Sequence, residues 1–113
     1  MNERDSIRLQ HILDAAREAL AFVQHRHKDD LAVDRMLALS LVKEIEIIGE
    51  AANQISKELR ESHPSIPWGR MIGMRNRLIH GYSEIDFEVL WDTVESSLPA
   101  LISQLVLLLD DSH

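Results

Sequence analysis

Several residue types are absent or scarce in this chain of 113 residues, and each shortage excludes a kind of chemistry. There is no cysteine, which excludes disulfide bonds, thiolate metal sites and cysteine nucleophiles. Only four glycines and three prolines interrupt an aliphatic sequence, and this favours helices. With two tryptophans, one tyrosine and two phenylalanines, the chain is poorly equipped to bind single strands by base stacking.

Long apolar runs are missing as well. No run approaches the ~18 residues of a membrane-spanning helix, and the opening MNERDSIRLQ lacks the apolar segment of a signal peptide. The length suits one hydrophobic core. We therefore expect a single domain over residues 1–113 that is cytoplasmic and makes no membrane contact.

Positive charge is missing from the last third of the chain. Residues 81–113 contain no Lys or Arg but seven acids: Glu84, Asp86, Glu88, Asp92, Glu95, Asp110 and Asp111. The net charge of −7 argues against a general nucleic-acid binder, because affinity for the phosphate backbone comes largely from Lys and Arg. Residues 57–80 are locally basic, although such a stretch is usually only a solvated face. The acidic end could repel RNA or attract a basic partner protein.

The apolar spacing predicts four helices, and therefore an all-α, antiparallel four-helix bundle. Their expected extents are residues 4–26, 30–61, 67–80, and a fourth from a cap at Ser83 or Asp86 to about Leu109. Pro67 suits the first turn of the third helix, and Gly81 suits its end. Pro99 is expected to bend the fourth helix.

The second helix carries a line of small residues at Ala38, Gly49, Ala52 and Ser56. A glycine inside a helix costs ~1 kcal/mol relative to alanine. Close approach of another helix, within the chain or across a dimer, would offset this cost. The alternative is that the helix simply tolerates the glycine.

The third helix ends in RNRLIHGY, residues 75–82, which combines several polar side chains. On an ideal helix, Asn76, Arg77 and His80 lie opposite the apolar face. Asn76 and His80 are four residues apart, so their side chains are expected to meet.

Arg75 is expected near the centre of the apolar face, where a guanidinium needs an anionic partner or a wet cleft. Glu44, in the middle of the apolar stripe of the second helix, is one candidate partner, whereas Glu46 and Glu50 lie on a different flank. Alternatively, this helix end lies at a subunit boundary, where Arg75 and His80 both face one groove.

Arginine and histidine together suit cleavage of RNA by its own 2′-hydroxyl. An imidazole can move the proton, and a guanidinium can stabilise the charge on a phosphorane-like transition state. This reaction needs no metal. The spacing alone is a weak indication, since Arg and His five residues apart occur often.

The residues from Arg75 to Tyr82 resemble the Arg-x(4)-His-x-Tyr signature of the HepT-like HEPN proteins (DUF86 family), the toxin halves of HEPN–MNT toxin–antitoxin pairs. The segments EIIGEAANQIS, IPWGRMIGMRNRLIHGY and IDFEVLWDTV are also similar to family segments in the expected order. The resemblance covers nearly the whole chain, and residues 1–25 are the least diagnostic.

The resemblance implies a homodimeric helical bundle that brings two motifs into one cleft. It implies a metal-independent endoribonuclease, with tRNA among its targets, that leaves cyclic phosphate ends and uses no cofactor. Arg75 and His80 become the catalytic pair, with Asn76 at the polar position beside them. Tyr82 matches the tyrosine that a partner nucleotidyltransferase antitoxin modifies with AMP.

Arg70 and Arg77 belong to the same basic stretch and are expected to contact RNA phosphates. AMP on Tyr82 would add negative charge beside Arg75 and His80 and repel RNA.

Two other functions remain open at this point. The chain could be a non-catalytic accessory subunit of a nucleotidyltransferase, with Arg75 and His80 binding a nucleotide or a partner. It could also be a helical dimerisation domain without chemistry. His25 and His27 are expected to be surface residues rather than metal ligands, because residues two apart point to nearly opposite sides of a helix. Trp68 is expected to anchor the core or an interface, as is Trp91.

Overall fold

The computed structural model describes residues 1–80 and 84–111 of the chain. Its elements are α1 (Glu3–Phe22), α2 (Asp30–Val33), α3 (Arg35–Asn53), α4 (Lys57–Ser62), α5 (Trp68–Leu78), β1 (Ile79–His80), β2 (Glu84–Ile85), α6 (Phe87–Asp92), the π-helical turn η1 (Thr93–Ser97) and α7 (Leu98–Asp111). The predicted all-α class is confirmed, with one very short antiparallel strand pair added to it.

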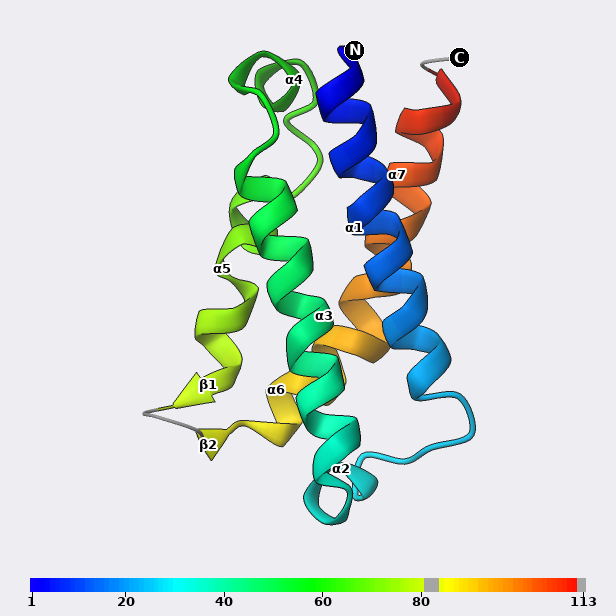
Figure 1. The fold of residues 1–113 in the computed structure, drawn as a ribbon, viewed down its shortest axis with the longest axis vertical. Helices are drawn as coiled ribbons and strands as arrows, with labels where there is room; N and C mark the ends of the chain where they lie inside the picture. Colours follow the sequence, from blue (N-terminus) through cyan, green and yellow to red (C-terminus); the bar gives the residue numbers. More distant parts are fainter. Residues whose placement is uncertain (81–83, 112–113) are drawn as a thin grey trace.

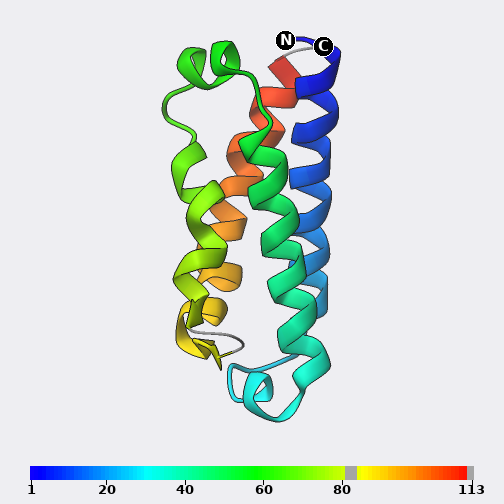
Figure 2. The ribbon, with the colours of Figure 1, turned by 60° about the vertical axis from the view of Figure 1, so that its left-hand side comes forward.

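The helices form an antiparallel bundle in which α3 lies between α1 and α5 (Figure 1). Helix α7 packs against α1, so it closes the far side of the core. Both termini lie at the end of the bundle that carries α4, whereas β1, β2 and α2 lie at the other end (Figures 1 and 2).

The core is one cluster of buried aliphatic side chains contributed by every long helix. Its fully buried large members include Leu9, Ile12, Leu31, Leu41, Ile45, Ile48, Met71, Leu78, Leu90, Leu98 and Leu105. Trp68 is buried and its indole N–H donates to the carbonyl of His63 at 3.0 Å, so the prediction that it anchors the core is confirmed. Trp91 is half-buried and packs against the same cluster.

The stretch Phe87–Asp110 is long and apolar enough to cross a membrane when judged by length and composition alone. In the bundle its buried leucines, such as Leu90, Leu98 and Leu105, pack into the core instead. One face of this stretch therefore belongs to the hydrophobic core of the bundle.

The predicted single helix over residues 30–61 is wrong, because the chain forms three helices there. Asp34 has extended backbone angles, and its carboxylate accepts the N–H of Leu37 at 3.1 Å, which starts α3. Ser56 starts α4 in the same way, with its hydroxyl accepting the N–H of Leu59 at 3.2 Å. The first N–H groups of a helix have no partner within the helix, and each of these polar side chains accepts a hydrogen bond from one of them. A new helix can therefore begin at each position although the apolar pattern continues through it.

Two side chains stabilise the second break, one distant in the sequence and one local. The buried Asp5 of α1 accepts the N–H of Ser56 at 2.9 Å and its hydroxyl at 2.5 Å. Arg60 donates to the carbonyls of Ala52 and Asn53 at the end of α3 and to that of Ile55 between α3 and α4. Carbonyls at a helix end have no partner within the helix, and a basic side chain can supply one.

The remaining boundaries differ less. Helix α1 ends at Phe22 rather than near residue 26, and His25 follows it with a φ of 62°. Asp86 caps α6 by accepting the N–H of Val89 at 3.1 Å, which confirms one of the two predicted caps. The other, Ser83, lies outside the described residues, as does Gly81. The turn η1 ends at Ser97, two residues before Pro99, which has no N–H to donate within the helix.

Candidate functional site

Gly49 fixes the position of α5 against α3. A Cβ atom at this residue would lie 3.2 Å from the carbonyl oxygen of Met71 and 3.4 Å from that of Ile72. Because glycine has no Cβ, the backbone of α5 can lie directly on α3. The predicted close approach of a helix to this glycine is therefore confirmed, and it occurs within the chain.

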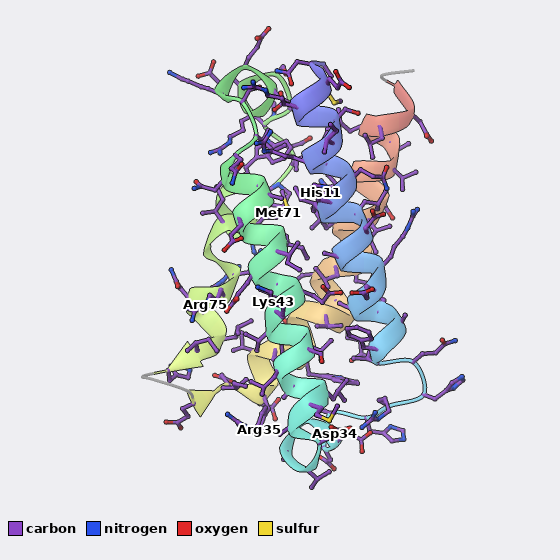
Figure 3. The ribbon with its side chains drawn as sticks, in the orientation of Figure 1. His11, Asp34, Arg35, Lys43, Met71 and Arg75 are labelled. Atoms are coloured by element: carbon purple, nitrogen blue, oxygen red, sulfur yellow. The ribbon has the colours of Figure 1, made fainter. Side chains whose placement is uncertain are left out.

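Arg75 lies at the edge of α5 rather than at the centre of its apolar face, so that prediction is wrong. The buried residues of the helix are Trp68, Met71, Met74 and Leu78, whereas 49% of the Arg75 side chain is exposed. Figure 3 shows Arg75 on α5, on the side of the bundle away from α1. Its Nε donates to Oε1 of Glu46 at 2.9 Å. The candidate pair with Glu44 does not form, and the partner is Glu46, a weaker candidate by sequence. The carboxyl of Glu44 neighbours Glu18 of α1 instead.

A pocket of about 410 Å³ opens between α3 and α5 around Arg75. Its lining residues are Ile45, Glu46, Gly49, Glu50, Asn53, Ile72, Arg75 and Asn76. The Arg75–Glu46 pair is exposed to solvent, and such pairs contribute only about 0–1 kcal/mol. The guanidinium can therefore exchange this carboxylate for another anion at little energetic cost.

His80 lies on β1, opposite Glu84 of β2, and its side chain is exposed. Its Nε2 is 3.3 Å from Oδ2 of Asp86. The predicted contact with Asn76 requires a helix that continues through residue 80, but α5 ends at Leu78, so this prediction is wrong. The chain leaves the helix because Ile79 is extended and pairs with Ile85.

The carboxylate of Asp86 contacts two neighbouring groups. Its Oδ1 accepts the N–H of Val89, and its Oδ2 faces the ring of His80. The Val89 N–H and, to a smaller extent, the imidazole hold the pKa of the Asp86 carboxyl below its ordinary value. A carboxylate in this place can orient the imidazole and stabilise its protonated form. The sequence reading recognised only the capping role of Asp86.

The other predicted site residues are distributed around the same helix. Arg77 donates from Nη2 to the carbonyl of Arg70 at 3.0 Å, and both residues are exposed. Tyr82 lies outside the described residues. Among the described residues, no hydrogen bond or ion pair joins Arg75 to His80; one borders the α3–α5 pocket and the other pairs with Asp86.

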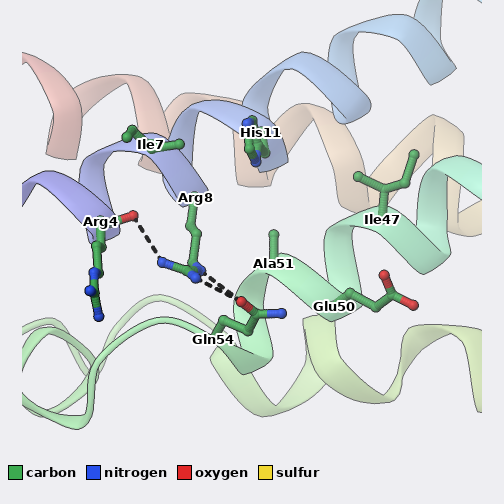
Figure 4. A pocket seen from close by; sticks show the side chains of 8 residues that line it. All are labelled: Arg4, Ile7, Arg8, His11, Ile47, Glu50, Ala51 and Gln54. Atoms are coloured by element: carbon green, nitrogen blue, oxygen red, sulfur yellow. Dashed lines mark hydrogen bonds between the residues drawn. The ribbon is translucent and has the colours of Figure 1, made fainter.

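A second pocket, which the sequence reading missed, opens between α1 and α3 and shares Glu50 with the first. It has about 410 Å³ and is lined by Arg4, Ile7, Arg8, His11, Ile47, Glu50, Ala51 and Gln54 (Figure 4). Arg8 donates from Nε at 3.0 Å and Nη2 at 2.8 Å to the amide oxygen of Gln54. The only signal in the sequence is the spacing of Arg4, Arg8 and His11, which places them on one face of α1.

No group of three or more His, Cys, Asp or Glu side chains suited to a metal ion occurs within residues 1–80 and 84–111. His25 and His27 lie in the loop after α1, not in the predicted helix, and both are exposed.

Comparison with known proteins places these features in a family. The model of the ribonuclease HepT-like family matches residues 12–108. Two proteins named "Putative RNase" are similar: TTE0752 of Caldanaerobacter subterraneus subsp. tengcongensis is 35% identical over 85% of this chain and 86% of its own length, and MJ1380 of Methanocaldococcus jannaschii is 34% identical over 89% and 94%.

"Probable ribonuclease HepT" of Thermococcus cleftensis is 40% identical over 65% of this chain and 66% of its own length. No solved structure matches the chain with significance. Because the family match covers most of the bundle and extends over both α5 and the His80–Asp86 pair, the chain belongs to the ribonuclease HepT-like family.

Proposed function

We propose that this protein is the endoribonuclease toxin of a HEPN–MNT toxin–antitoxin pair, with Arg75 and His80 as its catalytic residues. The observation that carries the proposal is the exposed imidazole of His80 held 3.3 Å from Asp86, two residues beyond the helix that presents Arg75. Membership of the ribonuclease HepT-like family supports the same reading.

The proposed reaction is transesterification within the RNA strand. The neutral imidazole of His80 takes the proton of a ribose 2′-hydroxyl, whose oxygen attacks the adjacent phosphorus. Asp86 stabilises the imidazolium that forms. The bond to the 5′ oxygen then breaks, this oxygen takes up a proton, and the products are a 2′,3′-cyclic phosphate and a 5′-hydroxyl end. The sequence of steps needs neither a metal nor a cofactor.

Arg75 would stabilise the charge on the phosphoryl oxygens in the transition state. Its present partner, Glu46, is 2.9 Å away in a solvent-exposed pair. A bidentate contact between guanidinium and phosphate is stronger than such a pair, so RNA can displace the carboxylate. Asn76 borders the same pocket and would hold a phosphate or ribose oxygen, while the exposed Arg70 and Arg77 would contact neighbouring phosphates.

We propose that the active form is a homodimer whose cleft contains both copies of the Arg75–His80 set. Two copies would place two guanidinium and two imidazole groups around one RNA strand. This concentrates positive charge in a protein whose net charge is −7. We propose that this single domain works in the cytoplasm on cellular RNA, including tRNA.

The proposed silencing step is transfer of AMP to Tyr82 by a partner nucleotidyltransferase. Tyr82 follows His80 by two residues in the sequence. A phosphodiester there would compete with RNA for the cationic groups.

The test is expression of the wild type and of His80→Ala in a bacterial host without the partner. We expect growth arrest and new cyclic-phosphate RNA ends with the wild type, and neither with His80→Ala. His27→Ala, which changes an exposed histidine in the loop after α1, is the matched control and should behave as the wild type. Equal toxicity of His80→Ala would contradict the mechanism.

One observation favours a second function, that of a nucleotide-binding accessory subunit. The Arg75 pocket also contains Glu46 and Glu50, and these carboxylates suit a short nucleotide better than a long polyanion. Binding of AMP or ATP that is lost in Arg75→Gln, together with harmless expression of the wild type, would support this function over cleavage.

A further inference from the structure

Glu44 is a buried acid without a suitable partner. Only 4% of its surface is exposed, and its Oε2 has no hydrogen-bond partner among the described residues. A buried polar atom without a hydrogen-bond partner destabilises the fold, and native structures contain few of them. Burial and, after it, the neighbouring carboxyl of Glu18 raise the pKa of Glu44 to about 7.

The two carboxyls lie at an open pocket between α1 and α3. The pocket measures about 340 Å³ and is lined by Glu18, Phe22, Leu39, Ser40, Lys43 and Glu44; we call it the acid pocket. Lys43 is exposed at its rim and forms no ion pair with either acid in the part of the chain that the structure describes. The hydroxyl of Ser40 already donates to the carbonyl of Met36 at 2.7 Å. Neither Glu18 nor Glu44 therefore has a cationic partner among the described residues.

Large apolar side chains surround the mouth of the acid pocket. Phe22 and Leu39 line it, Met36 is 82% exposed on the same face of α3 as Leu39, and Val33 on the adjoining α2 is 84% exposed. These four account for more than half of the exposed large apolar residues described for the chain. Large exposed apolar side chains that gather on one surface mark a site for another protein.

We propose that the acid pocket binds an arginine side chain of a partner protein, whose neighbouring apolar residues cover Phe22, Val33, Met36 and Leu39. The guanidinium is planar and carries five donors, so it can reach both carboxylates at once, and it is less strongly hydrated than an ammonium. Its aliphatic stem can pack against Phe22 and Leu39. The free Oε2 of Glu44 would then receive the donor that it lacks. The site shares no residue with the proposed RNA cleft and goes beyond it.

Charge complementarity points to a partner rather than to a small apolar ligand. An apolar ligand would leave the two acids unpaired, whereas a cation among apolar residues satisfies both features of the surface. With the protein carrying a net charge of −7, a basic partner is also favoured at longer range.

The test uses the full chain and three blocked peptides that differ at one position: Leu-Arg-Leu, Leu-Lys-Leu and Leu-citrulline-Leu. Backbone amide shifts are followed by NMR during titration at pH 7.5. We expect the arginine peptide to shift amides around Phe22, Leu39 and Glu44, and to bind at least fivefold more tightly than the lysine peptide. The citrulline peptide, which has the same shape without the charge, should leave these amides unchanged.

Glu44→Gln keeps the shape of the side chain and should weaken binding of the arginine peptide at least tenfold. Glu18→Gln should weaken the same binding independently. Equal binding of the citrulline peptide, or arginine binding that Glu44→Gln leaves intact, would overturn the proposal. A dimer dissociation constant that rises in Glu44→Gln without any peptide would assign the pocket to a second copy of the chain and overturn it as well.

Discussion

The buried carboxyl of Glu44 leads to a quantitative prediction about stability and pH. An isolated glutamate has a pKa of 4.5, and in the folded protein that of Glu44 is raised to about 7. Between these values the folded state holds a proton that the unfolded state has released, so the stability contributed by neutral Glu44 is present below pH 4.5 and is lost as the pH rises to about 7. At 1.36 kcal/mol per pKa unit, the full loss is about 3 kcal/mol.

Glu44→Gln should remove this loss because an amide of the same size does not ionise. Its thermal midpoint, measured by circular dichroism at pH 5 and at pH 8, should differ from the wild type by little at pH 5. At pH 8 the variant should melt later, by roughly 10 °C if each kcal/mol is worth about 4 °C in a protein of this size. The charged group that raises the pKa of Glu44 besides burial is Glu18 of α1, and Lys43 of α3 lines the same pocket.

Glu95→Gln is the matched control, since Glu95 is exposed and removal of its charge should change the midpoint by the same small amount at both pH values. A pH dependence of Glu44→Gln equal to that of the wild type would refute the reasoning. It would mean that the carboxyl is hydrated or satisfied in solution and that no ligand is needed to explain it.

Three further predictions concern the proposed cleavage site. Asp86→Asn should keep the cap of α6, because asparagine caps a helix as well as aspartate does. It should lower RNA cleavage by roughly 10- to 100-fold, because the charge beside His80 is lost. Cleavage equal to that of the wild type would remove Asp86 from the mechanism. Glu46→Gln should change the free energy of unfolding by less than about 1 kcal/mol. Because it frees Arg75, it should also strengthen RNA binding, which fluorescence anisotropy measures. Unchanged affinity for RNA would contradict the proposed exchange of Glu46 for phosphate. In urea unfolding, Gly49→Ala should lower the free energy of unfolding by about 1 kcal/mol or more, since its Cβ meets the backbone of α5. Gly73→Ala on α5 has open space around its Cβ and should raise that free energy by up to about 1 kcal/mol. The reverse order would refute the close contact between the two helices.

The parts of the fold that depend on local pattern could be predicted from the sequence. The apolar repeat predicted the four long helical stretches, and Gly49 predicted a helix in close contact. The break at Ser56 could not be predicted, because Ile55 and Leu59 on either side are both buried and continue the helical repeat. What stabilises the break is Asp5, which is 51 residues away in the chain.

The residues proposed for the candidate site could be named from the sequence, but their arrangement in space could not. An ideal helix through residue 80 placed Arg75 in the core and His80 beside Asn76. In the structure the pairing of Ile79 with Ile85 ends the helix two residues earlier and turns His80 toward Asp86. That pairing depends on two segments on either side of a turn, and a helical projection cannot represent it.

The position of the termini has a practical consequence for experiments on this protein. The molecule is 43 Å along its longest axis, and both chain ends lie at the end of the bundle opposite β1 and His80 (Figures 1 and 2). An affinity tag, a fluorophore or a surface linkage attached at either terminus is thus held roughly the length of the molecule away from the histidine. Immobilised protein should present the His80 end to dissolved RNA, whichever terminus is attached.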